Sequence, residues 1–288
     1  MCPPISPSST RRCQRLCLCA SPTRKSPKDF LGWRYYVKLI RFKYHISFIL
    51  VVIGLIFFSH GTNFSLLKLL FVLYISFNVL LYGGLYTLND IADIQSDARH
   101  TLKSKRPLPS GKITIKSATI FSLVLILSSL VIAYLSFSII IVYIFIIFIL
   151  LNLIYTFFAK KIAYIELVAN SMTYPLRFIM GIILGNGSVP YLFSFALFFG
   201  ALGLSTARRS SEKMMDGWNA RPTLKYYSRP KLLLIKILSF IFIVFFFFLD
   251  YPLHRWLYIL LIGVYVLAIF GIYFSRYIRG ILRTLWLK

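Results

Sequence analysis

Three aspartates, Asp90, Asp93 and Asp97, lie within the stretch NDIADIQSD of a chain that has only eight acidic residues. On a helix these side chains fall within about 60° of one face. Three carboxylates on one face repel one another unless cations offset their charge. Mg²⁺ suits such a face, because it takes one or two carboxylates, keeps some waters and accepts phosphate oxygens. The spacing therefore predicts a Mg²⁺ site for a phosphate-bearing substrate, with a solvated acidic face as the alternative.

Basic residues follow the aspartates directly: Arg99, Lys103, Lys105 and Arg106, then a Pro-x-Pro-Ser-Gly turn. Such a turn can fold the loop back over the end of the helix. Cations beside a metal-carboxylate site are what a diphosphate leaving group requires, because negative charge accumulates on it as its bond to carbon breaks. We therefore expect Lys105 and Arg106 to bind substrate, although cytoplasmic anchoring charge explains the same residues.

The elements that position these groups are apolar. The chain has 288 residues, of which 58% are hydrophobic and 14% charged, which is too apolar for an ordinary soluble domain. A membrane-spanning helix needs about 20 apolar residues. Eight windows meet this length, near residues 42–59, 65–88, 117–135, 137–157, 164–185, 190–206, 232–250 and 255–274. The sequence predicts an all-α, multi-pass transmembrane bundle.

Lysines and arginines gather in alternate turns between these windows, and the opposite turns carry only Lys68 and Arg255 at their edges. Because such residues are retained on the cytoplasmic side, we expect both termini and the aspartate loop to be cytoplasmic. The formal charge of +25 is then an orientation signal and an affinity for anionic headgroups. Basic residues spread over several loops argue against nucleic-acid binding.

The fifth window contains Glu166, Asn170, Thr173 and Arg177, whose spacing places them within about 60° of one helix face. Ionisable groups in a membrane helix are costly and face a bundle interior or a wet cavity. We expect this stripe to line the active-site pocket, with the helix kinked at Pro175. Asn89 belongs to a weaker stripe, where hydrogen bonding between helices is an equally good account.

Residues 1–35 differ from the rest in being rich in Ser, Pro, Arg and Cys, and we read them as a disordered basic leader before a membrane domain at 36–288. Such a segment is typical of an organelle transit peptide or a non-native upstream start. The location is therefore the plasma membrane, or an organelle membrane if the leader is a transit peptide. The four cysteines of the leader are free thiols or a metal-binding cluster.

The stretches NDIADIQSD and KSKRPLPSGKI resemble the signature of the UbiA superfamily of intramembrane prenyltransferases, N-D-x-x-D-x-x-x-D with a downstream R-P-L. The resemblance implies a helical bundle around a central cavity that opens to lipid, with Mg²⁺ held by two acidic motifs on cytoplasmic loops. Members transfer an isoprenoid from its diphosphate to an acceptor or, in one branch, a sugar phosphate to a lipid phosphate. The family usually has nine spans, so this chain either ends before the ninth or lays its basic tail on the membrane surface.

The second acidic motif of the family follows the sixth helix, where this chain has ARRSSEKMMD, with Glu212 and Asp216 at the required interval. Together with RPTLKYYS, this stretch is similar to the decaprenyl-phosphate phosphoribosyltransferase branch. Arg209 and Glu212 match its basic and acidic pair, and Arg221 and Tyr227 match its later element. The branch transfers 5-phosphoribose from phosphoribosyl diphosphate to polyprenyl phosphate. An ordinary charged loop is the alternative.

These residues are assigned two roles. Catalysis and metal binding fall to Asp90, Asp93, Asp97 and Glu212, with Asp216 as a further metal ligand. The residues expected to bind substrate are Asn89, Lys105, Arg106, Glu166, Asn170, Arg177, Arg209, Arg221 and Tyr227. The C–O bond of the donor loosens toward a carbocation, allylic for a prenyl donor and oxocarbenium-like for phosphoribose, and the acceptor then attacks.

Two other functions stay open. The first is prenyl transfer to an aromatic acceptor such as 4-hydroxybenzoate in quinone biosynthesis. The second is transport, which would place charge mainly at the membrane midplane, whereas the aspartates lie at a predicted membrane edge. The expected partners are membrane lipids and an isoprenoid phosphate or diphosphate substrate, with no obligate protein partner.

Overall fold

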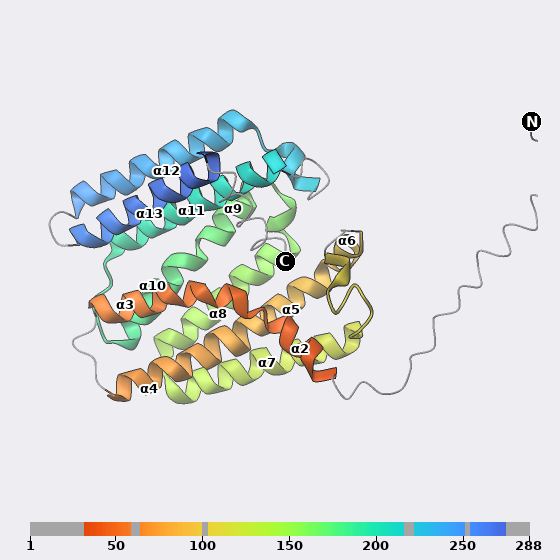
Figure 1. The fold of residues 1–288 in the computed structure, drawn as a ribbon. Helices are drawn as coiled ribbons and strands as arrows, with labels where there is room; N and C mark the ends of the chain where they lie inside the picture. The colour runs from red at the N-terminus through yellow and green to blue at the C-terminus, as the bar shows by residue number, and fades with distance from the viewer. Residues whose placement is uncertain (1–31, 59–63, 100–102, 216–221, 251–253, 275–288) are drawn as a thin grey trace, which may run out of the picture. The chain divides into compact units, whose positions relative to one another are not determined.

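The computed structural model describes residues 32–58, 64–99, 103–215, 222–250 and 254–274, and within these ranges it is helical without strands (Figure 1). Eight helical runs there are long and apolar enough to cross a membrane, which confirms the predicted number of spans. They are Gly32–Phe58, Phe64–Ala92, Ile115–Ser136, Ile139–Lys161, Ile165–Leu184, Tyr191–Met214, Arg229–Leu249 and Arg255–Ile272. The predicted leader through residue 31, Asp216 and Arg221 lie outside the described residues.

The bundle belongs to the larger of two units into which the chain divides, Arg34–Lys288. Figure 1 shows one group of helices formed by α4, α5, α7 and α8, and another formed by α11, α12 and α13. The bounds of the first group are Phe64–Leu73 for α4, Tyr82–Ala92 for α5, Ile115–Ser136 for α7 and Ile139–Phe157 for α8. Those of the second are Tyr191–Met215 for α11, Arg229–Leu249 for α12 and Arg255–Phe274 for α13.

Two central helices join the groups. α10 (Thr173–Leu184) packs along α3 (Ile49–Phe58) and also contacts both α8 and α11. Gly54 and Gly181 sit at the crossing of α3 and α10, where an added Cβ would meet the Phe178 carbonyl oxygen at 2.2 Å and the Val51 carbonyl oxygen at 2.0 Å. Small residues allow such close backbone approach in membranes, where packing drives helix association.

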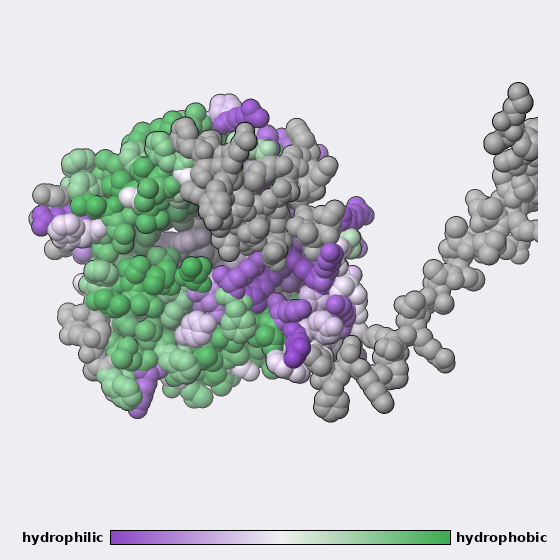
Figure 2. Space-filling view, in the orientation of Figure 1, coloured by the Kyte–Doolittle hydropathy of each residue, from purple (hydrophilic) through white to green (hydrophobic). Residues whose placement is uncertain are grey.

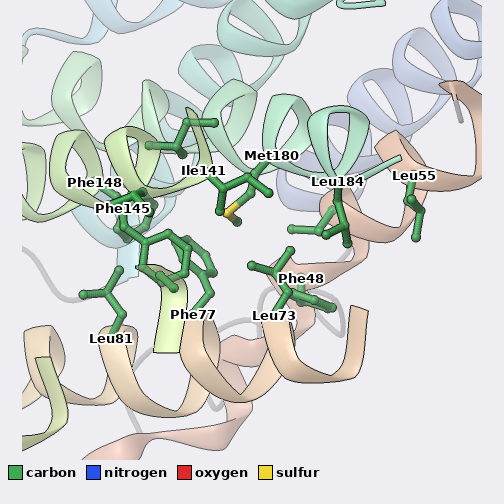
Figure 3. Packing of buried hydrophobic residues seen from close by; sticks show 14 of the residues in the cluster. Phe48, Leu55, Leu73, Phe77, Leu81, Ile141, Phe145, Phe148, Met180 and Leu184 are labelled. Atoms are coloured by element: carbon green, nitrogen blue, oxygen red, sulfur yellow. The ribbon is translucent and has the colours of Figure 1, made fainter. Parts of the chain in front are cut away.

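Each group has its own apolar core. In the first, Phe77 packs edge to face against Phe145 and Phe148, and Met180 and Leu184 reach the same cluster from α10 (Figure 3). Phe77 lies on η2 (Tyr74–Leu81), a π-helical stretch between α4 and α5. The core of the second group is built from α10, α11, α12 and α13. α10 therefore contributes side chains to both cores and fixes one group against the other.

The outward faces are hydrophobic, whereas hydrophilic residues gather where α5 gives way to α6 (Ile94–Ala98) (Figure 2). Large apolar side chains such as Leu127, Ile147 and Phe245 are about half exposed or more. In a bilayer these side chains contact lipid. Polar chemistry is thereby concentrated at one end of the bundle.

The predicted stripe of the fifth span lies on two helices rather than one. α9 (Ile165–Ser171) ends before α10 begins at Thr173, so the chain turns at Met172. Pro175 accounts for this position, because its ring clashes with the carbonyl four residues earlier, that of Ser171, and it has no N–H to donate there.

Candidate active site

Asp90, Asp93 and Asp97, here called the Asp cluster, lie where α5 ends and α6 begins. The helix is interrupted at Asp93, which has φ −96° and ψ 0°, and resumes at Ile94. Asp90 and Asp97 are only 4% and 3% exposed. Arg106 Nη1 lies 2.6 Å from Asp97 Oδ2 and 3.7 Å from Asp90 Oδ1. Two carboxylates therefore converge on one cationic group, as the helical spacing predicts.

Asp93 departs from that shared face. Lys160, which follows α8, places its Nζ 2.6 Å from Asp93 Oδ1 and 3.4 Å from the Asn89 side-chain oxygen. Thr156 also approaches the Asn89 oxygen, at 3.5 Å. Because the helix breaks at Asp93, this carboxylate turns toward α8 and not toward Arg106. Its side chain is 28% exposed and is the most accessible of the three.

The loop that carries Arg106 is anchored by apolar contacts. Leu108 and Ile113 are buried and pack in one cluster with Leu39. The Arg106 carbonyl accepts hydrogen bonds from the backbone N–H and hydroxyl of Ser110, and Gly111 supplies the left-handed conformation that ends the turn, with φ +71°. This folded loop holds Arg106 over the Asp cluster, whereas Lys105 is exposed and forms no ion pair with a described carboxylate.

Sequence reasoning did not assign Arg41 and Lys160 to the site. Arg41 forms an ion pair with Asp90, and its guanidinium lies 6.0 Å and 5.4 Å from the ring centroids of Tyr44 and Tyr86. Arg41 has φ +56° between α2 (Gly32–Ile40) and the 3-10 helix η1 (Phe42–Phe48), a turn that directs it to the bundle. Both cations lie at predicted cytoplasmic ends of spans, the same side of the membrane as the aspartates. That common position is the only sequence feature that could have assigned them to the site.

A second cluster joins α9, α11 and the loop before α12. Glu166, Arg209, Glu212 and Tyr227 form it, and we call it the Arg209 network. Arg209 donates to both oxygens of Glu166, at 2.8 Å and 3.1 Å, and the Tyr227 hydroxyl donates to Glu166 at 2.6 Å. Glu166 is 1% exposed. A buried carboxylate is stable only when paired and hydrogen-bonded in this way.

Glu212 completes the Arg209 network from within α11. Its oxygens lie 2.5 Å from Arg209 Nη1 and 3.1 Å from Arg208 Nε. In the part of the chain that the structure describes, no three His, Cys, Asp or Glu side chains form a ready metal site. Glu212 as a metal ligand therefore stays a prediction, and it requires this carboxylate to exchange an arginine for the metal.

Tyr227 ties the loop before α12 to this network. Its hydroxyl accepts a hydrogen bond from the backbone N–H of Tyr164, and Lys213 donates to its carbonyl. Burial, followed by the neighbouring Glu166 carboxylate, raises the pKa of Tyr227 above its usual range. The phenol therefore stays protonated and continues to donate to Glu166.

The other predicted residues of the fifth span do not meet a carboxylate in the described chain. Asn170 donates to the Ser205 hydroxyl at 3.1 Å. Arg177 is 1% exposed and donates to the Thr173 carbonyl at 2.8 Å. Its guanidinium lies 4.8 Å and 4.9 Å from the ring centroids of Phe148 and Tyr82. Aromatic faces attract the cation, so Arg177 is held by rings and a backbone oxygen.

The two clusters flank the same end of α8. Thr156 approaches the Asp cluster through Asn89, while the turn η4 (Ala159–Lys161) that follows α8 packs against α9, which carries Glu166. The Asp cluster and the Arg209 network therefore border one polar end of the bundle.

Comparison with known proteins decides the family. The model of the UbiA prenyltransferase family matches residues 47–283. The chain belongs to the UbiA prenyltransferase family. With its eight apolar helices, this UbiA protein is an integral multi-pass membrane protein.

Solved structures share the fold of this UbiA protein. A UbiA homologue from Archaeoglobus fulgidus bound to DMAPP and Mg²⁺ has a TM-score of 0.71 at 17% identity, over 88% of this chain and 96% of that one. A structure described for digeranylgeranylglyceryl phosphate synthase has a TM-score of 0.66 at 22% identity, over 89% and 95% of the two chains. The all-α UbiA bundle predicted from the resemblance is thus confirmed.

Curated relatives match over shorter stretches. Digeranylgeranylglyceryl phosphate synthase of Methanococcus aeolicus is 43% identical over 103 residues, 35% of each chain. An uncharacterised protein of Sinorhizobium fredii is 28% identical over 150 residues, 51% of this chain and 28% of that protein. The chain thus spans about a third of the length of these relatives. They support the family but not the narrower phosphoribosyltransferase branch predicted from the second motif.

Proposed function

We propose that this UbiA protein transfers a group from a diphosphate donor to an isoprenoid lipid that carries a phosphate, with Mg²⁺ held by the Asp cluster. The observation that carries the proposal is the convergence of Asp90 and Asp97 on Arg106. Carboxylates that share one cation 2.6 Å and 3.7 Å away can share a metal ion there, which fits the one or two carboxylates that Mg²⁺ takes. The Mg²⁺-bound Archaeoglobus relative supports the same ion.

The surrounding cations fit a diphosphate leaving group. Arg41, Arg106 and Lys160 each contact one of the three aspartates, and Lys103 lies 3.8 Å from Asp97. When Mg²⁺ is bound it neutralises part of the diphosphate charge. We propose that these side chains then turn from the carboxylates to the phosphate oxygens. Fixed cations stabilise the charge that develops as the C–O bond breaks.

For the donor we place phosphoribosyl diphosphate first. It carries a further phosphate besides its diphosphate, and Arg208, beside the Arg209 network, offers a partly exposed cation for it. Arg209 and Tyr227, from the two stretches that resemble the phosphoribosyltransferase branch, meet on Glu166 in one hydrogen-bonded cluster. Arg208, with 35% of its side chain exposed, borders the polar end and can reach a substrate there.

A prenyl diphosphate donor is the second candidate. The Archaeoglobus relatives are bound to DMAPP or GPP, and the named curated relatives are digeranylgeranylglyceryl phosphate synthases. Both donors leave as diphosphate, so the Asp cluster serves either. With a prenyl diphosphate donor, the acceptor is a phosphate-bearing lipid if this chain resembles the synthases in substrate. An aromatic acceptor is the remaining alternative.

One assay separates the donors. Purified protein in detergent with Mg²⁺ receives labelled phosphoribosyl diphosphate with a polyprenyl phosphate or, in parallel, labelled geranylgeranyl diphosphate with a glyceryl-ether phosphate lipid or 4-hydroxybenzoate. We expect label in the lipid product of the first mixture and its loss in Asp93→Ala. Product from the second set alone would assign prenyl transfer. Inactivity in every mixture would contradict the proposed function.

A further inference from the structure

A groove between the end of α11 and the start of α12 lies apart from the residues assigned to the reaction. It has a volume of about 330 Å³ and is lined by Ser210, Lys213, Met214, Arg229, Leu232 and Leu233. On α11 these residues face α12, whereas Arg209 and Glu212 face α9 and the Arg209 network. We propose that this groove binds an anionic phospholipid of the surrounding membrane leaflet through its phosphate.

The polar end of the groove is cationic. Lys213 and Arg229 line it, and buried Lys236 lies behind it with its Nζ 3.4 Å from the Ser210 hydroxyl. α12 begins at Arg229, and no side chain caps its N-terminus. Pro230 in the first turn has no N–H to donate, so the helix dipole is the feature of this N-terminus that adds to the attraction for an anion. Two cations and a helix N-terminus therefore meet at one rim.

The rest of the groove is apolar and opens to lipid. Leu232 is buried in its wall, while Leu233 and Met214 are 54% and 48% exposed. Leu234 and Ile237 continue the exposed apolar surface along α12. A ligand that fills this groove must carry a charged head beside an apolar chain. A phospholipid has that form, and Lys and Arg at a membrane surface attract anionic headgroups.

The groove is connected to the active site through Lys213. Lys213 donates to the Tyr227 carbonyl, and the Tyr227 hydroxyl donates to Glu166 at 2.6 Å. A phosphate beside Lys213 would share this ammonium group with the Tyr227 carbonyl. Lipid bound at Lys213 would therefore be coupled to the Arg209 network through two hydrogen bonds, from Lys213 to the Tyr227 carbonyl and from the Tyr227 hydroxyl to Glu166.

Binding is tested by native mass spectrometry of the full chain released from nanodiscs, so the readout does not depend on transfer activity. Nanodiscs of phosphatidylcholine alone, or with phosphatidic acid added, serve as the two lipid conditions. We expect phosphatidic acid to be retained by the unaltered protein and Arg229→Gln to weaken retention about fivefold, as expected for one cation at an anionic surface. Lys231→Gln, an exposed lysine two residues away that does not line the groove, is the matched control and should retain the lipid.

Equal loss in Arg229→Gln and Lys231→Gln would overturn the proposal, because it would show a general surface charge effect. Equal retention of phosphatidylcholine would overturn the requirement for an anionic head. Displacement of the lipid by millimolar inorganic phosphate alone would assign the groove to a free anion. Retention of polyprenyl phosphate in preference to phosphatidic acid would assign it to a substrate lipid instead.

Discussion

The Asp cluster and the Arg209 network both pair acids with bases at one end of the bundle, but they differ in how the charges are shared. In the Asp cluster the cations come from three separate segments: Arg41 before η1, Arg106 on a loop, which contacts both Asp97 and Asp90, and Lys160 after α8. In the Arg209 network one buried guanidinium serves two carboxylates and the hydroxyl of Tyr227 closes the set.

This difference separates two tasks. Long basic side chains on separate segments can leave their carboxylates when a metal and a phosphate arrive, so the Asp cluster is suited to chemistry. The Arg209 network is buried, and breaking it would leave an uncompensated charge in a medium of low polarity. It is suited to holding α9, α11 and the loop before α12 in place. The same isosteric amide substitution should therefore have opposite consequences in the two clusters.

The largest effect is expected for Asp93→Asn. Asp93 is the most accessible carboxylate of the cluster, and we propose that it leaves Lys160 to join Asp90 and Asp97 on Mg²⁺. The amide removes this charge and keeps the shape of the side chain, so transfer should fall by at least about a hundredfold while thermal stability in detergent changes little. Rates with the active donor pair and unfolding curves provide the two measurements. Asp250→Asn, at the far end of α12 where Asp250 pairs with His254, is the control and should keep its activity. Equal activity in Asp93→Asn would remove Asp93 from the metal site.

Glu166→Gln reverses the pattern and is the next largest effect. Arg209 loses the more deeply buried of its two charge partners and keeps only Glu212, which costs about 3 kcal/mol of stability by analogy with other buried pairs. The unfolding temperature of Glu166→Gln in detergent should therefore lie well below that of Asp93→Asn. The double variant Glu166→Leu with Arg209→Leu removes both charges and should recover most of the lost stability. A stable Glu166→Gln protein would show that the network does not hold these helices together.

A smaller effect separates metal ligands from arginine partners. Mn²⁺ bound in place of Mg²⁺ can be counted by electron paramagnetic resonance. Asp90→Asn should weaken Mn²⁺ binding about tenfold or more, whereas Glu212→Gln should change it by less than about twofold. Glu212 is paired with Arg208 and Arg209 of its own helix, whereas the arginine partners of Asp90 come from other segments and can move away. Equal weakening in both variants would instead place Glu212 among the metal ligands, as its position in the second motif predicts.

The sequence predicts one half of this comparison better than the other. Eight spans follow from apolar length, and the spacing of Asp90 and Asp97 places both carboxylates on one cation, because each depends on local periodicity. The partners Arg41 and Lys160 lie 49 and 67 residues from their aspartates in the chain. Their charge is also explained by membrane orientation, so no local pattern separates a ligand-binding cation from an anchoring one.

The Arg209 network shows the same limit. Its members were assigned to the site, but their pairing was not predicted, because Glu166 and Arg209 are 43 residues apart and lie on helices whose packing no sequence window contains. The break between α9 and α10 also separates Glu166 from Arg177, which a continuous helix would have kept on one face. Proline chemistry predicts a bend at this place, while the final partner of each side chain depends on the tertiary fold.

The smallest effect compares two neighbouring cations of the Asp cluster's loop. Lys105 is exposed, whereas Arg106 contacts both Asp97 and Asp90. We expect binding of the leaving group to depend on contact with the Asp cluster and not on the overall charge of the loop. Lys105→Gln should then lower the transfer rate by no more than about twofold, which is the scale of a solvent-screened charge. Arg106→Gln should lower it about tenfold or more. Measurements at low and high salt sharpen the test, since screening should erase the Lys105 effect and leave that of Arg106. Equal losses in both variants at high salt would show that Lys105 reaches the substrate itself.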